Sequence, residues 1–146
     1  MWTYNSVFYQ IYPIGFCGAP VHNDGVTVPR IRKIMEWSDY LKDLGVDSIL
    51  LNPIFDSDNH GYDTRDFRKI DCRLGTNEDF SDVCKDLHDH DIKIVLAVAF
   101  GHFVMSRKRN GTLHIRIGST LVLMVTVVIT MGSGMKDGKD ILNWSN

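Results

Sequence analysis

The sequence NPIFDSDNHGYDTRDFRKIDCRLGTNEDF at residues 52–80 decides how the rest of the chain is organised. It follows an apolar run at 48–51 that predicts a buried strand, and it shows no helical period before Thr76. A loop of that length in a compact domain is usually functional or disordered, and this one is not of low complexity. Its rings, carboxylates and guanidinium groups suit a sugar, because aromatic faces stack on pyranose rings and charged groups bond hydroxyls. The aromatic residues before Thr76 are Phe55, Tyr62 and Phe67.

Length and composition fit one domain of ordinary size. The chain has 146 residues, 44% of them apolar, which is enough for a hydrophobic core. A net charge of −2 gives no electrostatic reason to expect nucleic acid or an acidic membrane as a partner. Residues 1–10 lack the pattern of a signal peptide, and the apolar run at 120–131 is too short to span a bilayer. The three cysteines include no C-x-x-C pair, so reduced thiols in a cytoplasmic protein fit best.

On the N-terminal side of the long loop, the pattern predicts a strand, a helix and a second strand. Residues 6–12 are β-branched and aromatic and predict the first strand. Apolar residues at helical spacing predict an amphipathic helix over 28–44, which Gly45 ends. Residues 46–51 form the second predicted strand.

On the C-terminal side, a second helix and a third strand are expected. Thr76 is the expected N-cap, and Glu78 and Asp79 favour the first turn through the helix dipole. The nearly continuous apolar run at 92–100 is typical of a parallel strand that is covered on both faces. The alternation of strands and helices predicts an α/β fold with a parallel sheet, in which ligands bind at the carboxyl ends of the strands. The apolar face of the second helix comprises Phe80, Val83, Cys84 and Leu87.

Three ordered stretches carry a family resemblance. VFYQIYPIGF at 7–16, GVDSILLNPIFDSDNHGYDTRDFRKID at 45–71 and LGTNEDFSDVCKDLHDHDIKIVL at 74–96 together resemble the start of the α-amylase family, glycoside hydrolase family 13. The resemblance runs from Val7 to His102. It implies a partial (β/α)8 TIM barrel, of which this chain holds the first three strands and two helices. It also implies a glycosidase of the α-amylase or neopullulanase type, acting on α-1,4-glucans such as maltodextrin.

The resemblance assigns three substrate-binding residues. Tyr62 of the HGYD motif resembles the aromatic residue that stacks on the sugar, and Asp63 resembles a residue that shapes the same pocket. His102 resembles the histidine that ends the family signature D-x-V-x-N-H and bonds sugar hydroxyls. Without the motif, Tyr62 would be a packing aromatic and His102 a structural histidine, and these alternatives stay open.

This sequence departs from the family pattern at positions that the family uses for catalysis and for calcium binding. Ala97 stands where the family has Asp, which supports the catalytic carboxylates, and Gly101 stands where it has an Asn that often ligates calcium. The three catalytic carboxylates of the family follow later strands, so no catalytic residue is assigned among the Asp and Glu of this sequence. We therefore expect no cofactor and no metal site, although the parent family can bind calcium.

Charged clusters elsewhere have simpler interpretations. Asp-rich loops are usually solvated, and the loop lacks EF-hand spacing. Arg65, Arg68 and Lys69 are expected to pair with these Asp residues rather than bind phosphate. The run His88 to His90 is interpreted as a solvated helix end rather than a metal site, because adjacent helical residues point in different directions.

The composition and periodicity of the sequence change after Val104. Residues 105–146 contain no Asp or Glu before Asp137, and their apolar run has neither helical nor strand period. Codons compatible with 117–131 can be read one base earlier as DWFHFGFDGNSSYND, which resembles the segment that follows the family signature. We therefore predict a frameshift before Met105 and an irregular tail without native structure.

The sequence thus predicts residues 1–104 as the N-terminal part of an α-amylase-type barrel and 105–146 as an out-of-frame tail. By itself this polypeptide is expected to be inactive. Two alternatives stay open: a non-catalytic carbohydrate-binding remnant, and half of a split enzyme that a C-terminal fragment completes.

Overall fold

A three-stranded parallel sheet lies at the centre of the structure, a computed structural model that describes residues 2–99, 106–109, 112–115 and 124–125. Its strands are β1 (Phe8–Ile11), β2 (Ser48–Leu51) and β5 (Lys93–Leu96), in the order β1-β2-β5. The predicted parallel sheet is therefore confirmed. Ile94, Val95 and Leu96 are all buried, and since successive side chains point to opposite faces, both faces of β5 are covered as predicted.

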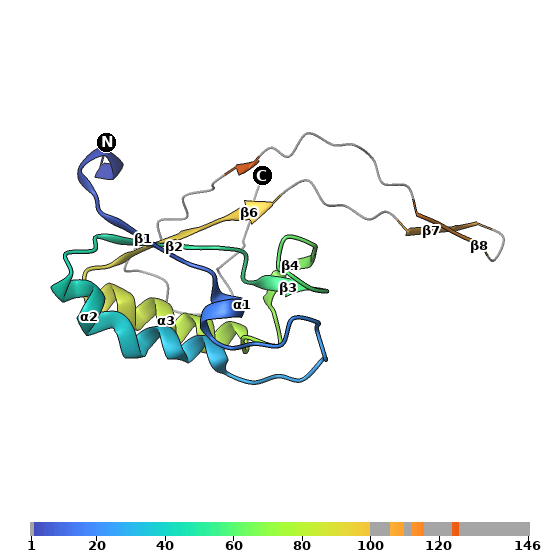
Figure 1. Ribbon diagram of the computed structural model, residues 1–146, viewed down its shortest axis with the longest axis horizontal. Coiled ribbons are helices and arrows are strands. Elements are labelled where there is room, and N and C mark those ends of the chain that lie inside the picture. The colour runs from blue at the N-terminus through green and yellow to red at the C-terminus, as the bar shows by residue number, and fades with distance from the viewer. Residues whose placement is uncertain (1, 100–105, 110–111, 116–123, 126–146) are drawn as a thin grey trace.

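Helices cover one face of this sheet (Figure 1). The expected single helix over 28–44 is instead a 3-10 helix, η2 (Arg30–Trp37), followed by α2 (Ser38–Asp43). The apolar spacing was nevertheless informative, because Ile31, Ile34 and Leu41 are fully buried in the core. The predicted stop at Gly45 is confirmed, since Gly45 adopts a φ of 81° directly after the end of α2.

Helix α3 (Asn77–Asp89) begins where the sequence predicted. Thr76 is its N-cap: the Thr76 hydroxyl accepts a hydrogen bond from the Asp79 N–H at 3.2 Å, and the Asp79 carboxylate accepts one from the Thr76 N–H at 2.9 Å. This reciprocal arrangement is a capping box, with Asp in place of the usual Glu. The predicted apolar face is buried against η2 and the sheet, and it comprises Phe80, Val83, Cys84 and Leu87.

The long loop contains a hairpin that the sequence did not predict. β3 (Phe55–Ser57) pairs antiparallel with β4 (Thr64–Ile70). The alternation in β4 is hidden because charged residues occupy both of its faces, and only Ile70 is fully buried. Phe55 of β3 and Phe67 of β4 hold the hairpin together through an edge-to-face contact with ring centroids 5.7 Å apart.

Short elements complete the described part of the chain. β6 pairs antiparallel with β9, and β7 with β8. Most of residues 105–146 lie outside the described residues, so the frame of the tail stays a prediction. None of the described helices is long and apolar enough to cross a membrane. The elements are η1 (Trp2–Asn5), α1 (Pro13–Phe16), β6 (Val98–Ala99), β7 (Ser106–Arg109), β8 (Thr112–Ile115) and β9 (Met124–Val125).

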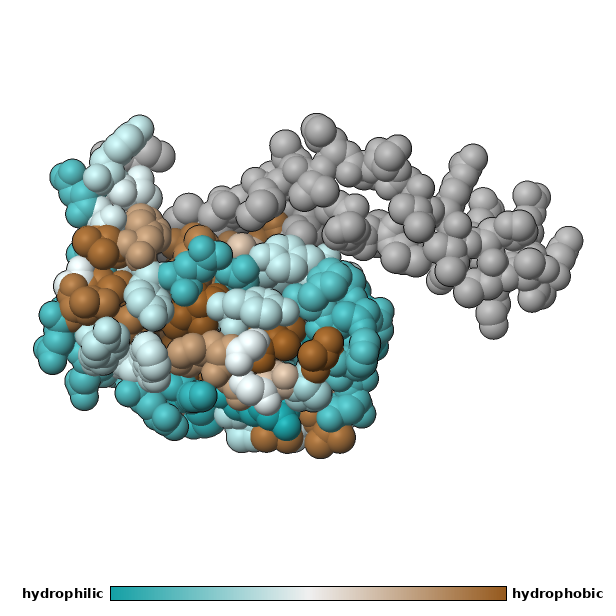
Figure 2. Space-filling model, in the orientation of Figure 1, coloured by the Kyte–Doolittle hydropathy of each residue, from teal (hydrophilic) through white to brown (hydrophobic). Residues whose placement is uncertain are grey.

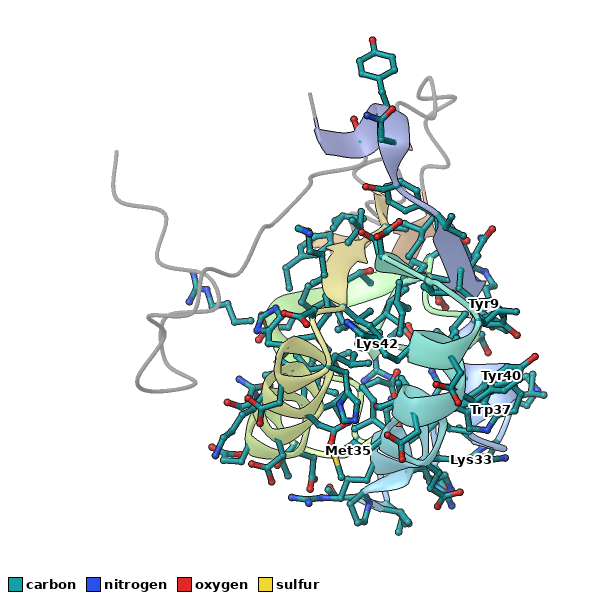
Figure 3. The ribbon with its side chains drawn as sticks, turned by 90° about the vertical axis from the view of Figure 1, so that its left-hand side faces the viewer. Tyr9, Lys33, Met35, Trp37, Tyr40 and Lys42 are labelled. Atoms are coloured by element: carbon teal, nitrogen blue, oxygen red, sulfur yellow. The ribbon has the colours of Figure 1, made fainter. Side chains whose placement is uncertain are left out.

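The surface is polar over the hairpin and more apolar at the opposite end (Figure 2). That apolar end includes Val7 and Phe8, where β1 begins, which are 53% and 43% exposed. A separate aromatic cluster lies on the flank of η2 and α2 (Figure 3), where the Trp37 ring makes edge-to-face contacts with Phe16 and Tyr40.

Candidate functional site

The candidate site lies at the carboxyl ends of β1 and β2, where α1 and the hairpin come together (Figure 1). Tyr12 directly follows β1, and Asn52 directly follows β2. The segment 58–63, which links β3 to β4, carries the HGYD motif to the same place, since the Tyr12 hydroxyl donates a hydrogen bond to the His60 carbonyl at 3.1 Å. The structure thus brings Tyr62 and Asp63 to the edge of the sheet at which ligands bind in α/β folds.

Tyr62 is held by residues that extend both parallel strands. Its hydroxyl oxygen accepts a hydrogen bond from the Asn52 side-chain amide at 2.6 Å. The Asn52 side-chain oxygen in turn accepts one from the Gln10 side chain of β1 at 2.7 Å. These two bonds fix the Tyr62 ring at the carboxyl ends of β1 and β2, where the ring is only partly buried. A ring in that position keeps apolar surface for stacking.

The turn before Tyr62 depends on glycine. Gly61 adopts a φ of 88°, and a Cβ atom there would lie 3.0 Å from the Pro53 carbonyl oxygen. This tight turn allows the Tyr62 N–H to donate to the His60 imidazole Nδ1 at 3.2 Å. The ring centroids of His60 and Tyr62 lie 6.0 Å apart.

Asp63 is the acidic residue of the site. Its Oδ2 accepts hydrogen bonds from the Asn59 backbone N–H at 2.9 Å and from the Asn59 side-chain amide at 3.0 Å. Burial alone would raise the pKa of Asp63, but hydrogen bonds from Asn59 and the nearby His60 imidazole lower it below its ordinary value. Asp63 is therefore ionised at neutral pH. Its Oδ1 is buried, has no hydrogen bond among the described residues and lies 3.5 Å from His60 Nδ1.

Tyr12 completes the site, although no sequence pattern predicted it as a site residue. Burial raises the pKa of its hydroxyl, so that the group stays protonated and acts as a donor. Asn52, Gln10 and His60 were also missed. A usable signal existed for two of them, because Tyr12 and Asn52 each immediately follow a predicted parallel strand.

A buried ion pair lies beneath the site. The side chains of Asp71 and Arg73 are both fully buried, with Arg73 Nη2 2.7 Å from Asp71 Oδ2. Burial by itself would raise the pKa of Asp71, but hydrogen bonds from Arg73 and Ser57 outweigh burial and lower it. The expectation that the Asp residues of this loop are solvated is therefore wrong for Asp71. It holds for Asp58, which is 61% exposed and pairs with Arg65 at 2.6 Å, as predicted for Arg65.

The other residues considered from the sequence are not part of the described site. Phe55 is only 3% exposed and packs on Phe67, so the Phe55 ring stabilises the hairpin and is not available to a sugar, whereas Phe67 is partly buried. Ala97 is buried and its N–H donates to the Leu51 carbonyl at 2.8 Å. His102 lies outside the described residues, so its assignment stays a prediction.

No cluster of three or more side chains suited to a metal ion occurs in the described part of the chain. A surface hollow of about 690 Å³ lies away from the site, beside η2. Its cations already have partners: Arg32 bonds Asp79 and Asp82, and Lys33 donates to the Phe16 carbonyl. Because Arg30 also donates to the Arg73 carbonyl, the hollow offers no unpaired cation for an anionic ligand. All three cysteines are free thiols, and they are Cys17, Cys72 and Cys84.

Comparison with known proteins finds one family. The model of the α-amylase catalytic domain matches residues 10–110. The oligo-1,6-glucosidase of Heyndrickxia coagulans is 42% identical over 116 residues, which cover 73% of this chain and 20% of that protein. The trehalose-6-phosphate hydrolase of Bacillus subtilis is 41% identical over 105 residues, which cover 69% of this chain and 18% of that protein.

Solved structures agree with the sequence relatives. The isomaltulose synthase SmuA from Protaminobacter rubrum matches with a TM-score of 0.54 and 35% identity, over 68% of this chain and 18% of that chain. The chain thus spans about a fifth of the length of the relatives it matches. The parallel sheet with its helices corresponds to part of a TIM barrel, and the described residues do not form a closed barrel.

Proposed function

This chain belongs to the α-amylase family, and on that premise we propose that it is the N-terminal part of a glycoside hydrolase that acts on α-linked glucose oligosaccharides. The observation that carries the proposal is the placement of Tyr62 and Asp63 together at the carboxyl ends of β1 and β2. The matched relatives are named for hydrolysis of short sugars. Those names favour short oligosaccharides, and α-1,4-glucans such as maltodextrin are the second substrate to test.

Each site residue has a proposed role. The Tyr62 ring stacks on the apolar face of a glucose ring, while its hydroxyl stays bonded to Asn52. The ionised Asp63 carboxylate accepts hydrogen bonds from sugar hydroxyls through Oδ1, which Asn59 does not bond and which is buried in this structure, so that sugar binding must expose it. His102 is proposed to bond the same sugar. These residues bind and orient the substrate, and none of them is assigned a role in bond cleavage.

Glycoside hydrolysis requires a pair of carboxylates that flank the scissile bond. No pair in the 146-residue sequence is assigned that role, so we propose that this polypeptide alone is inactive. A separately supplied C-terminal portion of the barrel would restore activity if the two associate. Residues 105–146 are proposed to be an out-of-frame tail that contributes nothing to the site.

The proposal also covers calcium binding and the cellular location of the protein. At the position where the family has a calcium-binding Asn, this chain has Gly101, which offers no side-chain oxygen and lies outside the described residues. We propose that the protein uses neither calcium nor another cofactor. The three free thiols support a cytoplasmic location.

A chimera tests the proposal. Residues 1–96 of this chain replace the matching segment of the oligo-1,6-glucosidase of Heyndrickxia coagulans, so that the relative supplies the catalytic carboxylates and the signature Asp that Ala97 replaces. We expect the chimera to hydrolyse isomaltose or maltose. Asp63→Ala should lower kcat/KM by about tenfold to a hundredfold, since hydrogen bonds to a charged group contribute roughly 1.5–3 kcal/mol.

Two variants make the result specific. Tyr62→Ala should also lower kcat/KM, whereas Tyr40→Ala should leave it unchanged, because Tyr40 is 55% exposed on α2 outside the site. A folded chimera that hydrolyses neither sugar would contradict the proposal. So would full activity in Tyr62→Ala and Asp63→Ala.

A carbohydrate-binding remnant is the second candidate function. It is favoured by one observation: Asn52 and Asn59, which bond Tyr62 and Asp63, both lie within residues 1–99, so sugar binding does not require the catalytic carboxylates. Retention of the 146-residue protein on an amylose column, lost in Tyr62→Ala, would support this candidate. Passage of the folded protein through the column would eliminate it.

A further inference from the structure

Arg73 has more hydrogen-bond donors than its ion pair with Asp71 uses. Arg73 Nε lies 2.8 Å from Asp71 Oδ1, and Nη2 lies 2.7 Å from Oδ2, so the guanidinium meets the carboxylate along one planar edge. Both side chains are fully buried. Burial of a charge is costly unless the charge is paired and its remaining hydrogens are bonded. The partners of those remaining hydrogens therefore define what Arg73 organises.

The opposite side of the guanidinium joins two segments that have no regular structure. Arg73 Nη1 donates to the carbonyls of Pro20 at 3.0 Å, Val21 at 2.7 Å and Asn59 at 2.7 Å, with one of its hydrogens shared. Pro20 and Val21 lie in the loop after α1, and Asn59 lies between β3 and β4. Nη2 also donates to the Ser57 hydroxyl at 2.9 Å. One side chain thus ties the end of the hairpin to the loop after α1.

Asn59 connects this anchor to the sugar site. Its backbone N–H and its side-chain amide both donate to Asp63 Oδ2. The Asn59 side-chain oxygen also pairs with the His22 imidazole at 2.7 Å, from the same loop that Arg73 holds. A shift of Asn59 must therefore move Asp63, and Tyr62 precedes Asp63 directly in the chain.

We propose that Arg73 is a positioning residue for the substrate site, acting through Asn59 on Asp63 and Tyr62. Arg73 itself does not reach the sugar. Its role rests on the proposed function, because it matters for activity only if Asp63 and Tyr62 bind substrate. Lysine cannot replace it, since an ammonium group lacks the planar fork that bonds a carboxylate on one side and backbone carbonyls on the other.

Amide hydrogen exchange in the full 146-residue protein tests the positioning directly and needs no sugar. The reporters are the amides of Asn59 and Tyr62, which are hydrogen-bonded within the 58–63 segment. In Arg73→Lys we expect them to exchange about tenfold faster or more, because bonds from a charged donor are lost. Amides within α3 report any general loss of stability and should accelerate by a much smaller factor. A uniform acceleration would mean that Arg73 only stabilises the fold, and unchanged reporters would also overturn the proposal.

Two further variants complete the test. Arg68→Lys is the matched control, because Arg68 lies exposed on β4 and should leave every reporter unchanged. Ser57→Ala serves if Arg73→Lys fails to fold, since it removes one acceptor of Arg73 and keeps both charges. It should accelerate the same two amides and spare α3, and failure to do so would overturn the proposal.

The chimera separates this proposal from the proposed function. If Asp63→Ala impairs the chimera, Arg73→Lys should impair it as well, and Arg68→Lys should not. If Asp63→Ala has no effect, the proposed function fails while the exchange data still decide whether Arg73 positions the 58–63 segment. An active chimera that needs Asp63 but tolerates Arg73→Lys without loss would overturn the positioning role.

Discussion

Asp71→Asn should be among the most destabilising single substitutions in this chain. Asp71 accepts hydrogen bonds from five donors: Nε, Nη2 and the backbone N–H of Arg73, and the hydroxyl and backbone N–H of Ser57. Asparagine keeps the shape but turns one oxygen into a donor that faces other donors. It also leaves the guanidinium charge buried without its partner. Breaking a buried pair in this way costs about 3–5 kcal/mol.

Urea unfolding followed by circular dichroism at pH 7 measures this loss, and thermal unfolding gives a second readout. In a folded unit of about 100 residues, such as residues 2–99, each kcal/mol lowers Tm by roughly 4–8 °C, so Asp71→Asn should lower it by at least about 12 °C. Asp58→Asn is the control, because Asp58 is 61% exposed in its pair with Arg65. Such surface pairs contribute less than about 1 kcal/mol.

The effect of Asp71→Asn on the free energy of unfolding should also depend on pH. The folded-state pKa of Asp71 is lowered, so its contribution is complete above the unfolded-state pKa and is lost as pH falls through the folded-state value. The stability gap between wild type and Asp71→Asn should therefore narrow on acidification below about pH 4. If Asp71→Asn costs no more than Asp58→Asn, or if the gap widens in acid, the buried pair does not stabilise the protein as described.

Three other predictions concern the helices and the tail. Thr76→Ala removes one half of the capping box and should lower the free energy of unfolding by about 1 kcal/mol in urea titrations, while Thr76→Ser should restore it; equal losses in both variants would contradict the capping role. Hydrogen bonding to the Asp86 carbonyl and to Asp39 raises the pKa of His90, so its stabilisation is complete below the unfolded-state pKa and is lost as pH rises through the folded-state pKa. His90→Gln should therefore destabilise the protein at pH 5.5 (about one unit below the ordinary histidine pKa) more than at alkaline pH, and a pH-independent difference would refute this. Sequencing the encoding DNA across codons 100–110 should reveal an alternative frame that continues the family pattern; without one, the frameshift prediction is wrong.

Much of the fold could be predicted because its signals are local. The N-cap at Thr76 and the apolar face of α3 depend on residues within two helical turns of each other. Consecutive apolar residues predict the β5 strand. These patterns are sufficient to predict a parallel sheet with helices between its strands.

The missed features depend on contacts that are distant in sequence. β4 is hidden because Arg65, Arg68 and Lys69 place charges along it, and its pairing with β3 depends on tertiary packing of Phe55 and Phe67. Arg73 was missed because charged residues are expected at the surface. Its acceptors are backbone carbonyls more than fifty residues earlier in the case of Pro20 and Val21, and a carbonyl leaves no trace in the sequence.

The site itself was predicted in part. The motif predicted Tyr62 and Asp63 as candidate site residues, while the residues that orient them were not predicted. Tyr12 and Asn52 become visible only when strand ends are known to meet at one edge of a sheet. Asn59 shows its role only through its two bonds to Asp63.

The most direct test of the central claim is a crystal structure of the chimera with bound glucose. We expect one face of the glucose ring to lie on the Tyr62 ring, and a sugar hydroxyl to lie about 2.5–3.0 Å from an Asp63 carboxylate oxygen. Glucose bound elsewhere, with Tyr62 and Asp63 making only the contacts they make within this chain, would contradict the assignment of the site.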